Sequence, residues 1–165
     1  MSNNFLEVKN VDFIIGGKTK VKNVSFDIEN EGDTLCILGP SGIGKTTILR
    51  TIAGLEEIEK GSIKLNGKLI SSKDKHVEPE YRNVSLAFQD NSLFPHYTVE
   101  KNILLGTERN KTKKKKKLTF KEIVDLLDIS KILVKYPHEI SAGEAQRASL
   151  ARSLLTQPDL LLLDE

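Results

Sequence analysis

The part of this sequence best suited to chemistry is a glycine-rich octapeptide that leads into a helical pattern. Its glycines let the backbone wrap closely around an anion, so that successive N–H groups and the helix start face it. Lys45 would then reach the β- and γ-phosphates of a nucleoside triphosphate, and the Thr46 hydroxyl would complete a Mg²⁺ shell. A purely structural turn would leave Lys45 unexplained. We therefore predict a nucleotide site made of Gly39, Pro40, Ser41, Gly42, Ile43, Gly44, Lys45, Thr46 and Thr47.

Two acidic residues follow an apolar run at the other end of the chain. The run Leu160–Leu163 predicts a buried parallel strand, which would bring Asp164 beside the phosphate-binding loop. There the carboxylate could hold Mg²⁺ through its water shell, while Glu165 could polarise a water molecule that attacks the γ-phosphate. Such an acidic pair is weak evidence alone, but together with the loop it predicts hydrolysis without a covalent intermediate.

The elements around the loop are predicted to be strands. Residues 6–8 and 21–28 favour strands, the second with Val24, Phe26 and Ile28 on one buried face. The wholly apolar run 34–38 is typical of a central strand covered on both faces, in which Cys36 would be a buried thiol. The helix after the loop should stop near Gly54, Asn66-Gly67 predicts a hairpin within 61–70, and residues 84–88 predict a further strand.

After residue 89 the patterns become helical. Thr98 can cap a helix that runs through Leu105. Two capping boxes, Thr119 with Glu122 and Ser141 with Glu144, predict two further helix starts. The six lysines at 111 and 113–117 are interpreted as a solvated connector, with contact to anionic lipid as the alternative.

Composition limits the class of protein. With 165 residues, 38% hydrophobic and 29% charged, and a net charge of +2, the chain is an ordinary globular domain and not a disordered or nucleic-acid-directed one. A single cysteine excludes an internal disulfide. No apolar stretch is long enough to cross a bilayer, so we expect any membrane association to come through a partner.

Three motifs, the last of them the acidic strand end, give the chain a family resemblance. Gln89 lies in AFQDNSLFP, the sequence ISAGE with AQR after it covers residues 140–147, and LLLLDE closes the chain. In order and spacing they resemble the glutamine loop, signature motif and acidic strand end of ABC ATPases. The resemblance implies an α/β fold: a P-loop NTPase core with an N-terminal antiparallel β subdomain and an inserted α-helical subdomain. The implied parts are a nucleotide-binding core at 1–89, a helical subdomain at 90–155 and a returning core strand at 156–165.

The resemblance also implies roles for individual residues. Gln89 and Glu165 would be catalytic, and Thr46, Gln89 and Asp164 would hold Mg²⁺. The signature residues would contact ATP bound by a second ATP-binding subunit, in a head-to-tail homodimer. Those signature residues are Ser141, Ala142, Gly143 and Glu144.

The sequence departs from the family pattern at three places. Ala142 replaces the first signature glycine, which would slightly hinder close backbone approach to a phosphate. Glu144 replaces the usual glutamine. The aromatic residue that stacks on adenine aligns with Ile15, so Phe13 is the nearest ring, either as a stacking partner or as ordinary core.

The segments 79–103 and 136–141 resemble the importer branch of the family, which serves uptake of ferric iron, polyamines, molybdate, sulfate or sugars. The resemblance implies an ATPase on the cytoplasmic face of the membrane, bound to permease subunits and fed indirectly by a binding protein, with ferric iron as our first choice of solute. Two alternatives are a soluble ABC ATPase of DNA repair or the ribosome, and a nucleotide-binding fragment without turnover.

In the family, the histidine that holds the γ-phosphate follows the acidic strand end. His76, His96 and His138 all precede Asp164, so none of them can take that role. We therefore expect a C-terminally shortened chain with little ATPase activity alone.

Overall fold

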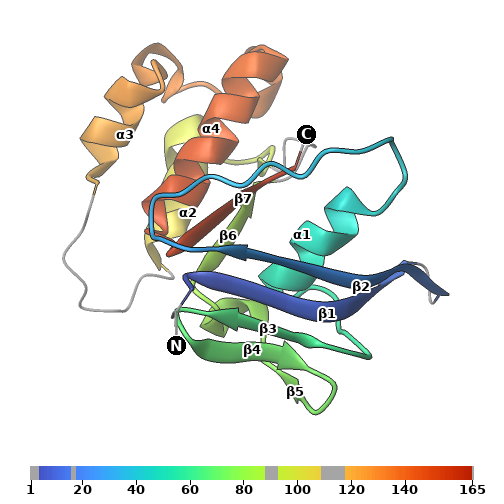
Figure 1. Cartoon of the computed structure of the whole chain (residues 1–165). Helices are drawn as coiled ribbons and strands as arrows, with labels where there is room; N and C mark the ends of the chain where they lie inside the picture. Colours follow the sequence, from blue (N-terminus) through green and yellow to red (C-terminus); the bar gives the residue numbers. More distant parts are fainter. Residues whose placement is uncertain (1–3, 16–17, 88–92, 109–117, 165) are drawn as a thin grey trace. The chain divides into compact units, whose positions relative to one another are not determined.

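The computed structural model describes residues 4–15, 18–87, 93–108 and 118–164, with the side chains of residues 14, 15, 18–20 and 108 left aside. The chain divides into two compact units, Met1–Val84 and Ser85–Glu165. Figure 1 labels their helices and strands. The three-part division that the sequence suggests stays a prediction.

The first unit contains a five-stranded antiparallel sheet in the order β2-β1-β3-β4-β5. The predicted hairpin is confirmed, because Asn66 (φ 50°) and Gly67 (φ 72°) form the two-residue turn between β3 and β4. The predicted alternation in β2 is confirmed in part: Asn23, Ser25 and Asp27 are exposed and Ile28 is buried, but Val24 and Phe26 are only half-buried. The strands are β1 (Leu6–Ile15), β2 (Lys18–Ile28), β3 (Ser62–Leu65), β4 (Lys68–Ser72) and β5 (Lys75–His76).

Helix α1 (Lys45–Ala53) packs against β1 on one face of this sheet (Figure 1). Ile48 and Ile52 of the helix are buried, as are Val8 and Ile63 of the sheet. The helix ends as predicted at Gly54, which has a φ of 91° and donates its N–H to the Thr51 carbonyl at 3.1 Å. The segment between β5 and β6 (Val84–Ala87) contains the 3-10 turn η1 (Pro79–Tyr81).

The prediction of a buried central strand at residues 34–38 is wrong. None of these residues belongs to either sheet among the described parts of the chain, and Leu38 is 85% exposed. Cys36, expected to be buried, is exposed as well. An apolar run indicates a tendency to be buried, but a strand also needs a neighbour that hydrogen-bonds to its backbone, and no described strand does so here.

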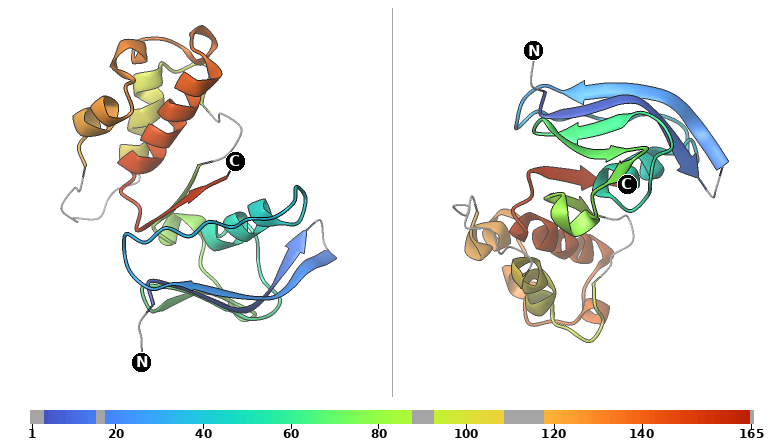
Figure 2. Two further views of the ribbon diagram at one scale, coloured as in Figure 1. Left: turned by 45° about the horizontal axis from the view of Figure 1, so that its top comes forward. Right: turned by 90° about the horizontal axis from the view of Figure 1, so that it is seen from below.

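The second unit is mainly helical, and Figure 2 shows α2 and α4 side by side. Its core gathers Val99 and Ile103 of α2, Ile123 of α3 and Ala148 of α4, all at most 4% exposed. The predicted caps are confirmed: Thr98 accepts a hydrogen bond from the Lys101 N–H, and both predicted capping boxes are present. The elements are α2 (Val99–Glu108), α3 (Phe120–Leu126), η2 (Ser130–Ile132), η3 (Pro137–Glu139) and α4 (Ala142–Leu155).

Strands β6 (Val84–Ala87) and β7 (Leu160–Leu163) form a separate two-stranded sheet. The N–H of Asp164, directly after β7, donates to the carbonyl of Ala87 at the end of β6 at 3.1 Å. Their carboxyl ends therefore meet, so the two strands run parallel. The expectation that β7 is fully buried is wrong at Leu163, which is 56% exposed, because side chains alternate between the two faces of a strand.

The described helices are all too short, or too polar, to cross a membrane. The lysine-rich stretch lies within residues 109–117, outside the described part of the chain.

Asn102 is a fully buried polar residue that the sequence analysis did not single out. Its side-chain oxygen accepts the N–H of Phe94 at 2.7 Å, and its amide group donates to the carbonyls of Phe94, Tyr97 and Thr98 at 3.0–3.1 Å. These bonds hold the segment 94–98 against the start of α2. On that segment the rings of Phe94, His96 and Tyr97 contact one another, with the His96 and Tyr97 centroids 4.3 Å apart.

We expect Asn102→Ala to lower the free energy of unfolding of the helical unit by about 2–4 kcal/mol, because it leaves several buried backbone groups without a partner. Urea unfolding followed by circular dichroism at the helix band measures the change. Asn4→Ala is the matched control, since Asn4 bonds Asp27 at an exposed position and should change stability by no more than about 0.5 kcal/mol. Equal effects of the two substitutions would contradict this role of Asn102.

Candidate functional site

The predicted phosphate-binding loop bends into α1 through two glycines. Gly42 has a φ of 77° and Gly44 a φ of 110°, both in the left-handed region that side chains disfavour. Gly44 is the residue that caps α1, and it makes no side-chain cap because it has no side chain. The first N–H groups of α1 therefore have no capping side chain in front of them, which is the arrangement in which a helix start can bind an anion.

Lys45 folds back over the loop. Its ammonium group donates to the carbonyls of Gly39 and Pro40, at 2.7 and 2.9 Å. An ammonium has three N–H donors, so these two bonds leave a third for a ligand. The positive charge is thus held over the loop by the loop's own backbone.

The two threonines that follow Lys45 have different surroundings. Thr46 is exposed on the first turn of α1. Thr47 is half-buried, and its carbonyl accepts the hydroxyl proton of Thr51 one turn later, at 2.8 Å. The predicted contact of Thr46 with Mg²⁺ and the inclusion of Thr47 in the nucleotide site stay predictions.

The predicted signature residues lie at the start of α4. Ser141 caps the helix by accepting the Glu144 N–H at 3.3 Å, and Glu144 accepts both the N–H and the hydroxyl of Ser141, at 2.8 and 2.9 Å. These two hydrogen bonds, the backbone one first, lower the pKa of Glu144 below its ordinary value, with help from the charges of Lys135 and Arg147. Ser141, Ala142 and Gly143 are exposed, so the helix start is accessible.

The acidic strand end is only partly described. Asp164 follows β7 and is half-buried. Gln89 and Glu165, the two residues predicted to be catalytic, lie outside the described residues. The structure thus brings the loop residues together in the first unit, and the signature residues and Asp164 belong to the second.

Phe13 does not fit the role of an adenine-stacking ring. Its side chain is fully buried in the first unit, and its backbone bridges to Ile58. A ring without exposed surface cannot stack on a ligand, so its alternative role as core material is the correct one. The Ile15 side chain lies outside the described set.

One buried residue near α1 escaped the sequence analysis. Arg82 is 3% exposed and its guanidinium bonds to the last turn of α1. Hydrophobic periodicity gives no signal for such a residue, because arginine is ordinarily read as a surface residue.

The chain resembles known proteins over nearly its whole length. Residues 21–165 match the ABC transporter family. The Fe(3+) ions import ATP-binding protein FbpC of Fusobacterium nucleatum is 38% identical over 161 residues, covering 97% of this chain and 42% of that protein. The spermidine/putrescine import ATP-binding protein PotA of Nitrosospira multiformis is 42% identical over 161 residues, covering 97% and 43% respectively.

A solved structure supports the fold. It is described as the ATP binding subunit of an ABC transporter and superimposes with a TM-score of 0.80 at 23% identity, covering 98% of this chain and 66% of the other. The predicted α/β class with a β subdomain and a helical subdomain is therefore confirmed at the level of the fold. The chain spans less than half the length of these two curated relatives.

Ser141→Ala should raise the pKa of Glu144 towards its ordinary value, because the hydroxyl donor is lost, and leave the pKa of Glu122 lowered. Glu122 is the internal control, since Thr119 lowers its pKa in the same way. A folded pKa below the unfolded one contributes stability that is present above the unfolded pKa and lost as pH falls through the folded pKa. An acid titration followed by ¹³C NMR of the glutamate carboxyl groups measures both values. An unchanged Glu144 curve in the variant would show that the Ser141 hydroxyl does not donate to the Glu144 carboxylate.

Proposed function

The chain belongs to the ABC transporter family, and from that premise we propose that it is an ATP-binding and ATP-hydrolysing subunit that energises solute import across the cytoplasmic membrane. The observation that carries the proposal is the Lys45 ammonium held over a glycine loop at the start of α1. A nucleoside triphosphate presents the concentrated negative charge that such a site favours.

In the proposed complex, the backbone N–H groups of the loop bind the phosphate oxygens. Lys45 bridges the β- and γ-phosphates with its ammonium group. Because its present partners are loop carbonyls, the charge is already oriented before ATP arrives. This preorganisation reduces the conformational cost of binding.

The donor atoms fit Mg²⁺, which prefers oxygen and is commonly held by one or two carboxylates together with substrate phosphates. Thr46 offers a hydroxyl and Asp164 a carboxylate, and Gln89 would add its side-chain oxygen. Bound Mg²⁺ would neutralise charge on the phosphates. Within the described residues, no cluster of three or more His, Cys, Asp or Glu could hold a metal. In the proposed complex, the phosphates would complete the coordination.

Glu165 is the proposed general base for hydrolysis, with Gln89 orienting the attacking water. Both follow strands of the two-stranded sheet in sequence, Gln89 after β6 and Glu165 after β7. The carboxyl ends of these two strands meet at Asp164 and Ala87. Hydrolysis of ATP to ADP and phosphate is the proposed reaction.

We place the signature residues in a homodimer, where the start of α4 contacts the γ-phosphate bound by the second ATP-binding subunit. The exposure of Ser141, Ala142 and Gly143 supports this arrangement. Closure of the head-to-tail dimer on ATP is the proposed power stroke, and hydrolysis with phosphate release reopens it.

Permease subunits are the proposed membrane partners, docking near Gln89 and the helical unit. Support comes from large apolar side chains that this unit exposes on α2, α3 and the segments beside them, since such surfaces often mark interfaces. They are Phe94, Leu104, Leu126, Val134 and Tyr136. This docking would hold the chain on the cytoplasmic face of the membrane, with a periplasmic or extracellular binding protein as an indirect partner.

Ferric iron is the proposed solute, because the similar protein of Fusobacterium nucleatum is named an Fe(3+) ions import ATP-binding protein. Polyamine, sulfate and molybdate are the alternatives, because similar relatives carry those names. The solute does not touch this subunit in the proposed mechanism. Hydrolysis stimulated by each solute in vesicles that contain the permease and binding protein distinguishes them, and stimulation by a polyamine alone would overturn the choice of iron.

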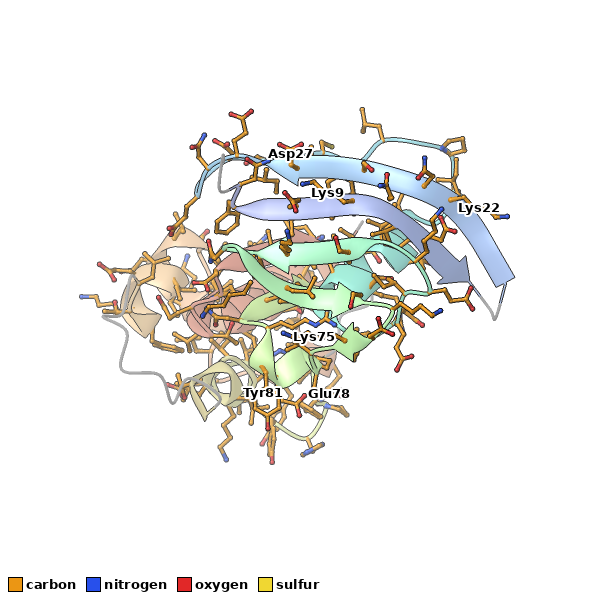
Figure 3. All side chains as sticks on the ribbon, turned by 60° about the horizontal axis from the view of Figure 1, so that its bottom comes forward. Lys9, Lys22, Asp27, Lys75, Glu78 and Tyr81 are labelled. Carbon is orange, nitrogen blue, oxygen red and sulfur yellow. The ribbon has the colours of Figure 1, made fainter. Side chains whose placement is uncertain are left out.

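Lys45→Ala should abolish tight ATP binding, because it removes the charge that bridges the terminal phosphates; we expect a loss of about 100-fold or more in affinity. Isothermal titration with ATP and Mg²⁺ measures it. Lys22→Ala, at an exposed position on β2 (Figure 3), is the matched control and should bind ATP like the unmodified chain. Unchanged affinity in Lys45→Ala would refute the proposed site.

Ser141→Arg should leave ATP binding intact and prevent dimer formation, because a bulky cation would fill the partner's phosphate site. Size-exclusion chromatography with ATP, in a Glu165→Gln background that slows hydrolysis, reads out the dimer. The parent Glu165→Gln chain is the control. If the chain with both substitutions still forms a dimer, this result would count against a role of α4 across the interface.

A further inference from the structure

Arg82 is a buried charge that the proposed mechanism does not use. It is 3% exposed, whereas Tyr81 beside it is 77% exposed and Glu78 also points outward beyond β5 (Figure 3). Burial lowers the pKa of Arg82 to about 10, against a smaller opposing effect of the negative charge on Glu78. A chain tolerates a buried guanidinium only where its hydrogen bonds are made.

All five N–H donors of the guanidinium have partners. The Nε group donates to the Val77 carbonyl at 2.5 Å. One terminal nitrogen donates to the carbonyls of Thr51 and Ile52, at 2.9 and 3.1 Å, and the other to the Ser71 hydroxyl and His76 Nδ1, at 2.9 and 3.3 Å. The side chain thus joins the last turn of α1 to β4, to β5 and to the residue that follows β5.

The contacts of His76 and Gly54 complete this network. Because His76 Nδ1 accepts from Arg82, Nε2 carries the proton and donates to the Gly54 carbonyl at 3.1 Å. A Cβ added to Gly54 would lie 2.4 Å from Arg82 Nε. The absence of a side chain at this position therefore lets the guanidinium reach the end of α1, in addition to permitting its left-handed backbone.

The end of α1 that Arg82 holds is directly linked to the phosphate-binding loop. The helix has nine residues, Lys45–Ala53, so it is only about 13 Å long. A change in the direction of its last turn would move its first turn, where Lys45 and the glycine loop lie. The hydrogen bonds from Arg82 to the carbonyls of Thr51 and Ile52 are buried. Without the guanidinium these carbonyls would lack a partner, and the last turn of α1 would shift towards other donors.

We propose that Arg82 is a positioning residue for nucleotide binding, which fixes the C-terminal end of α1 and thereby the placement of the phosphate-binding loop at its start. The inference rests on the proposed function and adds a residue to it. The guanidinium is required for its planar fork of five donors, because a lysine ammonium is a single point with three.

Arg82→Lys in the whole chain tests the proposal, with Arg50→Lys as the matched control on the same helix. Arg50 pairs with Glu56 at 3.1 Å at a partly exposed position, so its replacement should change ATP affinity by less than about twofold. In Arg82→Lys we expect the Kd for ATP of the folded protein to rise about 10- to 100-fold. The ¹H–¹⁵N signals of Gly42 and Gly44 should shift before any ATP is added.

A merely structural role would lower the melting temperature and leave the ATP Kd of the folded molecules and the two glycine signals unchanged; that result would overturn the proposal. If Arg82→Lys fails to fold, Ser71→Ala removes a single acceptor and should give a smaller change of both readouts in the same direction. Wild-type affinity and glycine signals in folded Ser71→Ala would likewise overturn it. A failure of the proposed function is distinguishable, because then the unmodified chain itself would not bind ATP.

Discussion

A helix leaves N–H groups unpaired at its start and carbonyls unpaired at its end, and the structure around α1 depends on how these two ends are treated. At the start no side chain caps the helix, and glycines keep the backbone open to an anion. At the end Gly54 and Arg82 satisfy the carbonyls inside the fold. The same short helix is therefore anchored at one end and ready for a ligand at the other.

The starts of α3 and α4 in the second unit, in contrast, are capped by side chains. Both α3 and α4 begin with a capping box in which a glutamate returns a hydrogen bond to the capping residue. At α4 this places the carboxylate of Glu144 on the Ser141 hydroxyl. A phosphate that approaches Ser141 from a partner subunit would meet a negative charge, so the proposed dimer would have to displace or outweigh that contact.

Local patterns predicted local structure well. The Asn66-Gly67 turn, the stop at Gly54 and the capping residues were all readable, because each depends on a few neighbouring residues. The pairing of strands distant in the sequence could not be predicted. Residues 34–38 have the composition of a central strand, but composition does not reveal whether another strand will pair with them. Leu163 was taken as buried because an apolar run does not show which of the two faces of its strand is covered.

The glycine loop and Lys45 could be singled out from the sequence because chemistry fixes their residue types, and their role in nucleotide binding stays a prediction. Arg82 and Asn102 could not be predicted, because each acts by bonding to backbone carbonyls of residues distant in the sequence or around a turn, and no periodicity marks such contacts. Phe13 had two possible roles from sequence, and only its burial decided between them.

The central claim is that the start of α1 binds the phosphates of ATP. Amide hydrogen exchange of the whole chain, measured with and without ATP and Mg²⁺, tests it most directly, since a bound phosphate protects the N–H groups that it accepts from. We expect slower exchange at Gly42, Gly44, Lys45 and Thr46, with little change in the β3–β4 hairpin. Exchange that stays the same at these four amides while ATP is bound would contradict it.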